Sequence, residues 1–274
     1  MSDRLVRARR NVHLVRVMLA IDLRARLQYR GDFAVWIVFG VLFQIAALVF
    51  VAVVVTHFGG IGGWSIAEVL LIVGIRLTAH ALFEMIFGNV GRVSWMVRDG
   101  WFDRLLVRPA SPLVQVIGTS FQVNGFGDLL VGLLALGTAL PAVGVGQPVV
   151  AGLQIVVVVF GSVLLETGLQ LALASTAFWF VRTDSLAWWL DDWGNTFSNY
   201  PVTVYPLVAR FLLTWILPLA LLGFFPAAAV MGRAGDVPFT PLLAWGAPIF
   251  GLLAFLGARH VWRVGIDHHR STGT

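Results

Sequence analysis

The feature that most constrains the fold of this chain is a series of long stretches almost free of charged residues. A hydrocarbon core about 30 Å thick takes roughly twenty helical residues to cross. Six stretches are at least that long: residues 33–57, 66–90, 113–140, 149–181, 203–223 and 241–263. Hydrophobic residues make up 58% of the chain and charged residues 12%, whereas about a quarter of a soluble domain is charged. The chain is therefore expected in a membrane.

These stretches predict helices. Inside lipid every backbone N–H and C=O group needs a partner, and a continuous apolar run of this length satisfies that need only as an α-helix. The sequence predicts an all-α, polytopic membrane protein with six transmembrane helices in a single domain, residues 1–274. No linker or internal repeat divides it.

Arginine sets the expected orientation. All nineteen basic residues are arginine, and sixteen fall in segments that a six-span topology places on one side: eight before residue 31, four between residues 92 and 108, then Arg182, Arg259, Arg263 and Arg270. The opposite loops carry only Arg233. The positive-inside rule places both termini in the cytoplasm. We interpret the net charge of +5 as attraction to anionic membrane lipids, and expect no nucleic acid partner.

The segments outside the spans are short. Residues 1–32 predict an amphipathic helix on the inner surface, with apolar residues along one stripe. Residues 91–112 alternate basic, acidic and aromatic residues, and Gly100 and Pro109 divide them into short pieces. Residues 184–200 hold three tryptophans beside Asp191 and Asp192, which suits the headgroup level. Composition alone explains both loops as interfacial connectors.

Between the fifth and sixth spans, Pro218 and Pro226 flank an apolar tract. They predict that the helix breaks and that a re-entrant segment dips back into the outer leaflet before Arg233. Such broken backbone is tolerated in a membrane where protein or a water-filled cavity covers it.

Several kinds of chemistry are excluded. Without lysine the chain has no G-x-x-x-x-G-K-[ST] phosphate loop, and without cysteine it has no thiolate nucleophile or thiolate metal site. Neither H-E-x-x-H nor G-x-S-x-G occurs. We expect no catalytic, cofactor or metal site in this chain, and no enzyme activity of its own.

Ionisable residues inside the predicted spans are the remaining candidates for function. Arg76, His80 and Glu84 recur every four residues, on one helix face, while Glu166 and Gln170 form a polar stripe in the fourth span. An unpaired charge at mid-membrane depth costs at least about 2.5–3.5 kcal/mol. Two interpretations stay open: a translocation path or proton relay, or a structural pair of Arg76 with Glu166 or Glu84.

The chain also resembles the membrane subunits of ABC-2 type ABC transporters, in the branch of multidrug or antibiotic exporter permeases. The resemblance runs over nearly the whole chain. Its markers are residues 27–33, residues 62–65 with Glu68, residues 100–106 with Arg108 and Pro109, Phe178 with Trp179, Tyr200 with Pro201, and the run from Leu213 through Pro218 to Pro226 and Ala227.

The resemblance implies a coupling helix after the second span that docks on a separate ATPase subunit, where ATP and Mg²⁺ are bound. Carried over to this sequence, Trp101 or Phe102 enters an apolar groove of the ATPase. Four charged residues pair at its rim: Arg98, Asp99, Asp103 and Arg104. A second permease, a related chain or another copy, completes the transporter in the bacterial inner (plasma) membrane.

The expected function is ATP-driven export of a hydrophobic or amphipathic molecule such as a drug, an antibiotic or a lipid-like compound. The candidates for the translocation path are Arg76, His80, Glu84, Glu166, Gln170, Pro218 and Pro226. A rival function is a proton-coupled secondary transporter or channel that uses Arg76, His80, Glu84 and Glu166. A structural membrane scaffold is a third possibility.

Overall fold

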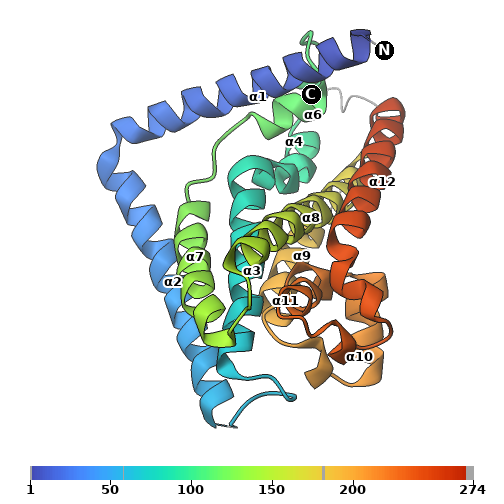
Figure 1. The fold of residues 1–274 in the computed structure, drawn as a ribbon. Coiled ribbons are helices and arrows are strands. Elements are labelled where there is room, and N and C mark those ends of the chain that lie inside the picture. Colours follow the sequence, from blue (N-terminus) through green and yellow to red (C-terminus); the bar gives the residue numbers. More distant parts are fainter. Residues whose placement is uncertain (1, 58, 181–182, 270–274) are drawn as a thin grey trace.

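The computed structural model describes residues 2–57, 59–180 and 183–269 (Figure 1). Arg182 and Arg270, two of the arginines assigned to the inner side, lie outside these residues, as do Met1 and Val181 at the ends of predicted segments. The described chain is helical, and its only strand-like pairing is an isolated bridge between Ile61 and Trp64. The predicted all-α class is confirmed.

In the described residues, five helices are long and apolar enough to cross a membrane: α2 (Arg30–His57), α3 (Ile66–Phe87), α7 (Gly125–Val143), α8 (Pro148–Ser175) and α12 (Gly246–His268). Short helices extend three of them: η1 (Gly88–Arg92) and α4 (Val93–Arg98) follow α3, η2 (Thr176–Phe178) follows α8, and η7 (Pro241–Trp245) precedes α12. These helices match four of the six predicted spans closely and a fifth in part.

The third predicted span starts later than expected. Residues 113–140 do not form one helix, because α6 (Pro112–Ile117) ends at Gly118 and α7 begins only at Gly125. The side chain of Asn89 donates hydrogen bonds to the carbonyl oxygens of Ile117 and Ser120. These bonds satisfy backbone groups that a continuous helix would have paired internally.

The fifth predicted span, residues 203–223, is wrong as a single helix. The chain there forms η3 (Val202–Val204), α10 (Leu207–Phe211), η4 (Leu212–Ile216) and η5 (Leu219–Leu222). Pro206 and Pro218 separate these pieces, since a proline cannot donate a backbone hydrogen bond and disfavours helical geometry in the residue before it. Leu207–Ile216 is an apolar helix of only ten residues, too short to cross alone.

The chain passes from one end of the bundle to the other earlier, in a segment that the sequence assigned to the headgroup level. Helix α9 (Asp184–Phe197) packs against α8. Just before it, Thr183 bonds to Ser94 of α4, and after it the Oγ1 of Thr203 accepts a bond from the Trp64 indole before α3. Residues 184–204 therefore connect the two ends of the bundle. Hydropathy did not predict this passage, because the acidic residues of the segment lower its mean hydropathy.

The segment after this crossing is re-entrant. It starts at Thr203, which bonds to Trp64 at the end of the bundle where α3 begins. It returns to that same end, where Arg233 contacts Glu68 at 2.7 Å. Between these points it descends to Gly223, where an added Cβ would lie 3.1 Å from the Cβ of Arg76. Arg76 is ten residues into α3, or about 15 Å from its start. Pro218 breaks the helix just before η5, whereas Pro226 lies in the first turn of α11 (Phe224–Val230), where proline is tolerated.

The start of α1 (Ser2–Gln28) and the end of α12 lie at one end of the bundle, and α1 crosses that end (Figure 1). The Asp22 carboxylate accepts a hydrogen bond of 2.7 Å from the Phe121 backbone, which ties α1 to the α6–α7 connection. Helix α4 and the end of α12 share this end with α1 (Figure 1). The short helix α5 (Asp103–Leu106) lies there too, because it packs on α6 and Asp103 contacts His269 after α12. The elements that carry most of the arginines are thus gathered on one side.

Helix α3 is the centre of the bundle and α2 lies at its periphery. In their most apolar windows, 72% of the α3 residues are buried but only 11% of the α2 residues. The closest helix pairs meet at glycines: a Cβ on Gly251 of α12 would lie 2.2 Å from the Gly161 oxygen of α8. Small residues that let backbones approach are typical of helix contacts in membranes.

Candidate functional site

The segment between α3 and α7 forms a compact helical bend at the end that carries both termini. After α4, Gly100 adopts a left-handed conformation with φ 67°, and the backbone N–H of Phe102 returns to the oxygen of Met96 at 2.8 Å. A residue with a side chain is strained at such a φ, so glycine permits the reversal. Helix α5 then turns the chain toward α6, and the bend presents its residues on a fixed frame.

The charged residues predicted for an ATPase rim lie on this bend. Arg98, Asp99 and Arg104 are exposed, and Asp103 is half-buried. Arg98 Nε contacts Asp99 Oδ1 at 3.1 Å, and Asp103 Oδ1 lies 2.8 Å from His269 Nε2. Asp103 therefore already has a partner within the chain, at the end of α12.

Of the two aromatic residues predicted to enter a groove of another protein, the structure makes Phe102 an internal residue. Its side chain is 0% exposed. The ring lies edge-on to Phe178, Trp262 and His269, with centroids 5.1, 5.8 and 5.6 Å away. Trp101 stays half-buried at the surface. Phe102 thus joins the bend to the ends of α8 and α12, and only Trp101 remains for an external contact.

Sequence reasoning missed two exposed apolar residues of the bend. Val107 is 85% exposed and Leu106 is 40% exposed, between the exposed side chains of Arg104 and Arg108. The sequence did contain a signal for them, because a short apolar run stands there between two arginines. Apolar anchors surrounded by charged residues are a common arrangement at protein interfaces.

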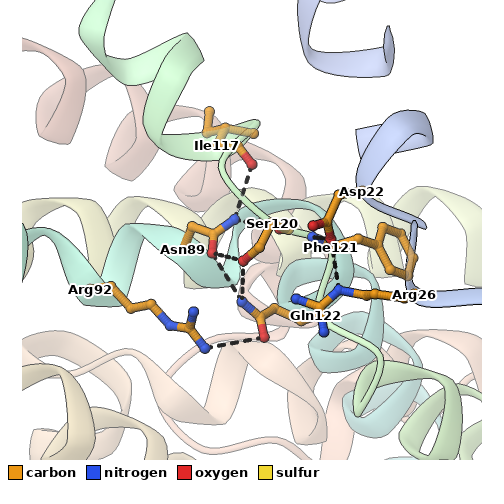
Figure 2. Close-up of polar contacts among 8 residues, drawn as sticks. All are labelled: Asp22, Arg26, Asn89, Arg92, Ile117, Ser120, Phe121 and Gln122. Atoms are coloured by element: carbon orange, nitrogen blue, oxygen red, sulfur yellow. Dashed lines mark hydrogen bonds and ion pairs between the residues drawn. The ribbon is translucent and has the colours of Figure 1, made fainter. Parts of the chain in front are cut away.

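A polar network centred on Asn89 ties this bend to the rest of the chain (Figure 2). Asn89 is buried in η1, donates to two backbone oxygens of the α6–α7 connection, and accepts bonds from Ser120 at 2.7 Å and Gln122 at 3.0 Å. The Gln122 oxygen accepts a bond from Arg92 at 3.4 Å. The neighbouring Phe121 backbone holds Asp22, and Arg26 also bonds to this acid (Figure 2). The C-terminal end of α3, the start of α7 and α1 therefore meet at one point.

The ionisable residues inside the bundle form a second cluster, with partners that differ from those predicted. Glu166 pairs with His80, Oε1 to Nδ1, at 2.5 Å. The predicted pairs of Arg76 with Glu166 or Glu84 are absent among the described contacts. Gln170 donates a short hydrogen bond to Asp191 of α9. The cluster therefore joins three helices, α3, α8 and α9, inside the bundle.

Arg76 is 2% exposed, and its Nη1 has no hydrogen-bond partner among the described residues. The acids that act on it electrostatically are Glu166, Asp128 and Asp191. It lies against the turn of the re-entrant segment, at Gly223. Glu84 is half-buried, one turn from the end of α3. Sequence reasoning missed Asp128, which accepts a 2.8 Å bond from Gln44 and links α2 to α7.

A third polar group closes the opposite end of the bundle. Arg233 contacts Glu68 at 2.7 Å and Asp236 at 2.6 Å, and its guanidinium lies 3.9 Å from the centre of the Trp64 ring. Burial lowers the pKa of Arg233, but the hydrogen bonds to Asp236 and Glu68 raise it overall above its usual value. These contacts fasten the loop before α3 to the end of the re-entrant segment.

An apolar cavity of about 180 Å³ lies between α8, α9 and the re-entrant turn, and it offers no polar lining. Leu173, Trp189, Trp193 and Leu217 are among its walls. Within the described ranges, no group of three or more His, Asp or Glu residues is arranged to hold a metal ion.

A family model described as ABC-2 family transporter protein matches residues 41–273, which is most of the chain. No curated protein and no solved structure matches it. The matched region contains the bend, the buried polar cluster and the re-entrant segment. The chain thus belongs to the ABC-2 family, as a membrane permease subunit of an ABC transporter that works with ABC ATPase subunits.

Proposed function

We propose that this chain is the permease of an ATP-driven exporter of hydrophobic or amphipathic molecules in the bacterial inner membrane. In this proposal the end with both termini faces the cytoplasm. The ATPase binds ATP and Mg²⁺ and docks on the bend between α3 and α7. The observation that carries the proposal is the exposed tip at Leu106 and Val107, between two arginines, on a bend fixed to the membrane helices.

The docking contact combines this tip with neighbouring residues. Leu106, Val107 and the half-buried Trp101 supply apolar area, while Arg98, Asp99 and Arg104 supply charges around it. Apolar anchors contribute most of the affinity at interfaces, and charges at the rim contribute orientation and association rate.

Movement of the ATPase is passed to the membrane by rigid contacts. Phe102 joins the bend to α8 and α12, and the Asn89 network joins it to α7 and α1. Closure of the ATPase therefore tilts these helices together. A second permease, either a related chain or another copy, forms the other wall of the path. The permease helices would have two arrangements, before and after this tilt. ATP drives the change between them because the closed ATPase binds the two arrangements with different affinity.

Arg76, the re-entrant turn at Pro218 and the apolar cavity beside α9 form the candidate path in this chain. The cavity has no polar lining, which supports an apolar or amphipathic substrate. The rival, a proton-coupled transporter, would use the buried pair of His80 and Glu166 as its proton carrier.

The test is copurification and ATPase stimulation with the complete complex. Trp101→Ala with Arg104→Ala, and separately Leu106→Ser with Val107→Ser, are expected to lower retention of the ATPase on the permease. Both are expected to abolish permease-dependent ATP hydrolysis. Arg24→Gln with Arg30→Gln, on exposed residues of the same end, is the control. Unchanged coupling in both docking variants would contradict the proposal, as would transport in vesicles that follows a proton gradient without ATP.

A further inference from the structure

A groove of about 360 Å³ lies between the start of α6 and the last turns of α12. This volume is within the roughly 300–1,000 Å³ of small-molecule sites. Arg259, Arg263, Ser111 and Asp267 line it, and the buried Trp262 is part of its wall. None of these residues belongs to the tip proposed for ATPase docking.

The two arginines are available for a ligand. Arg259 and Arg263 are exposed, and among the residues that the structure describes neither has an ion-pair partner. They stand four residues apart, so their guanidinium groups share one helix face. Two guanidinium groups on one face provide planar sets of N–H donors, and the oxygens of a phosphate accept hydrogen bonds from them.

The same face of α12 continues as an apolar stripe toward the middle of the membrane. Leu252 and Leu256 precede Arg259 and Arg263 at the spacing i, i+4, i+7, i+11, and each leucine is 49% exposed. The stripe is about 16 Å long at 1.5 Å per residue, close to half of a hydrocarbon core about 30 Å thick. A ligand along it has a charged group at the groove and an acyl chain on the leucines.

We propose that this groove binds one anionic phospholipid, with its phosphodiester between Arg259 and Arg263 and an acyl chain along Leu252 and Leu256. Ser111 donates a hydrogen bond to the headgroup. Asp267, one turn beyond Arg263, repels a second phosphate but accepts a bond from a headgroup hydroxyl. This donor and acceptor set favours phosphatidylglycerol over a headgroup without hydroxyls.

The site has a structural consequence for the permease. The groove lies between α6, in the bend, and the C-terminal end of α12, where Trp262 contacts Phe102 and His269 contacts Asp103. A bound lipid therefore holds α6 and the end of α12 together, and its loss loosens the frame of the bend.

The test is lipid-dependent thermal unfolding of the purified full chain in detergent, followed by tryptophan fluorescence. We expect a saturable rise in midpoint with dioleoylphosphatidylglycerol, and none with dioleoylphosphatidylcholine or inorganic phosphate at equal concentration. Arg259→Gln with Arg263→Gln should raise the lipid concentration needed for half of the rise about thirtyfold, because each basic residue near an anionic headgroup contributes roughly fivefold to the affinity. Arg24→Gln with Arg30→Gln, which removes the same charge elsewhere, should leave the effect unchanged.

Two further variants keep the test decisive if the glutamine pair does not fold. Arg259→Lys with Arg263→Lys keeps the charge and should bind more weakly than the native chain, but in the same order of lipids. Leu252→Ser with Leu256→Ser should weaken binding while both arginines remain.

Three results would overturn the proposal. One is an equal response to phosphatidylcholine or to free phosphate, and another is an equal loss in the Arg24 and Arg30 control. The third is a glutamine pair that binds the lipid normally but loses the ATPase, since the groove would then be a protein-docking surface.

Discussion

Glu166 is a carboxylate buried in the middle of a membrane bundle, and the structure gives it His80 as its partner. Both side chains are only 9% exposed. The sequence suggested Arg76 as the partner of Glu166, because an arginine is always charged and Arg76 was expected at a similar depth in the membrane. The stagger of α3 against α8 decides instead which residue is within hydrogen-bonding distance. Removal of one partner from such a pair leaves the other buried and unpaired.

We predict that His80→Leu or Glu166→Leu alone destabilises the protein by about 3–5 kcal/mol, as expected when one partner of a buried pair is removed. The double variant with both leucines should recover most of that loss, because no unpaired polar group remains. Thermal unfolding in detergent, measured on all three variants, checks this. Equal stability of single and double variants would show that the two residues are not energetically coupled.

The same variants separate the two interpretations of the cluster. If the pair is structural, the double variant regains ATP-driven transport together with stability. If the pair carries protons, the double variant is stable but transports nothing.

Phe102 and Trp95 lie seven residues apart, and their replacement by alanine should have very different effects on stability. Phe102→Ala removes a fully buried ring and is predicted to cost about 3–5 kcal/mol of stability. Trp95 is 48% exposed, so Trp95→Ala should change stability by less than about 0.5 kcal/mol. Thermal unfolding compares them, and similar midpoints would contradict the internal role of Phe102.

At the scale of elements, the helix contacts depend on glycines whose backbones nearly touch. Gly251 on α12 faces Gly161 on α8, and a Cβ at Gly168 would lie 2.6 Å from the backbone of Ala254. The neighbouring atoms are backbone, which does not yield as a flexible side chain does. The distance between α8 and α12 is therefore set by residues without side chains.

Gly251→Ala is predicted to destabilise the protein by about 1–3 kcal/mol, the usual cost of overpacking. Gly257→Ala on the same helix is the matched control, since a Cβ there meets nothing within 4 Å. It should be neutral or stabilising by up to about 1 kcal/mol, because alanine favours helix more than glycine does. A control as unstable as Gly251→Ala would argue against this packing.

Helix α9 illustrates which elements could be predicted and which could not. Long apolar runs such as α2 and α8 are recognisable because their signal is local. Helix α9 carries Asp184, Asp191 and Asp192, so its sequence is typical of a surface segment. It enters the bundle because Gln170 of α8 provides a partner for Asp191, and no local pattern reveals that.

At the scale of the whole molecule, the bend and the membrane helices are joined through few buried side chains. Asn89 is 1% exposed and satisfies two backbone oxygens in the α6–α7 connection. An apolar side chain of similar size at this position could not donate hydrogen bonds to these two carbonyl oxygens. The network therefore gives the bend a fixed position relative to α3 and α7.

We predict that Asn89→Ala lowers stability by about 1–3 kcal/mol for each carbonyl left without a partner. It should keep ATPase binding, because the exposed tip at Leu106 and Val107 is untouched, but lose permease-dependent stimulation of ATP hydrolysis. Asn195→Ala, on an exposed residue of α9, is the control. Normal stimulation in Asn89→Ala would mean that the network does not transmit movement.

The sequence by itself determined the helical membrane class, four of the crossings and the position of the bend, because hydrophobic length and helix-breaking residues act locally. It also indicated the re-entrant segment, since proline acts on its own neighbours in the chain. The tertiary structure alone decided that His80 pairs with Glu166, that Phe102 turns inward and that α9 crosses the bundle. Each of these depends on how helices distant in sequence are staggered, and close packing at glycines and buried hydrogen bonds set that stagger.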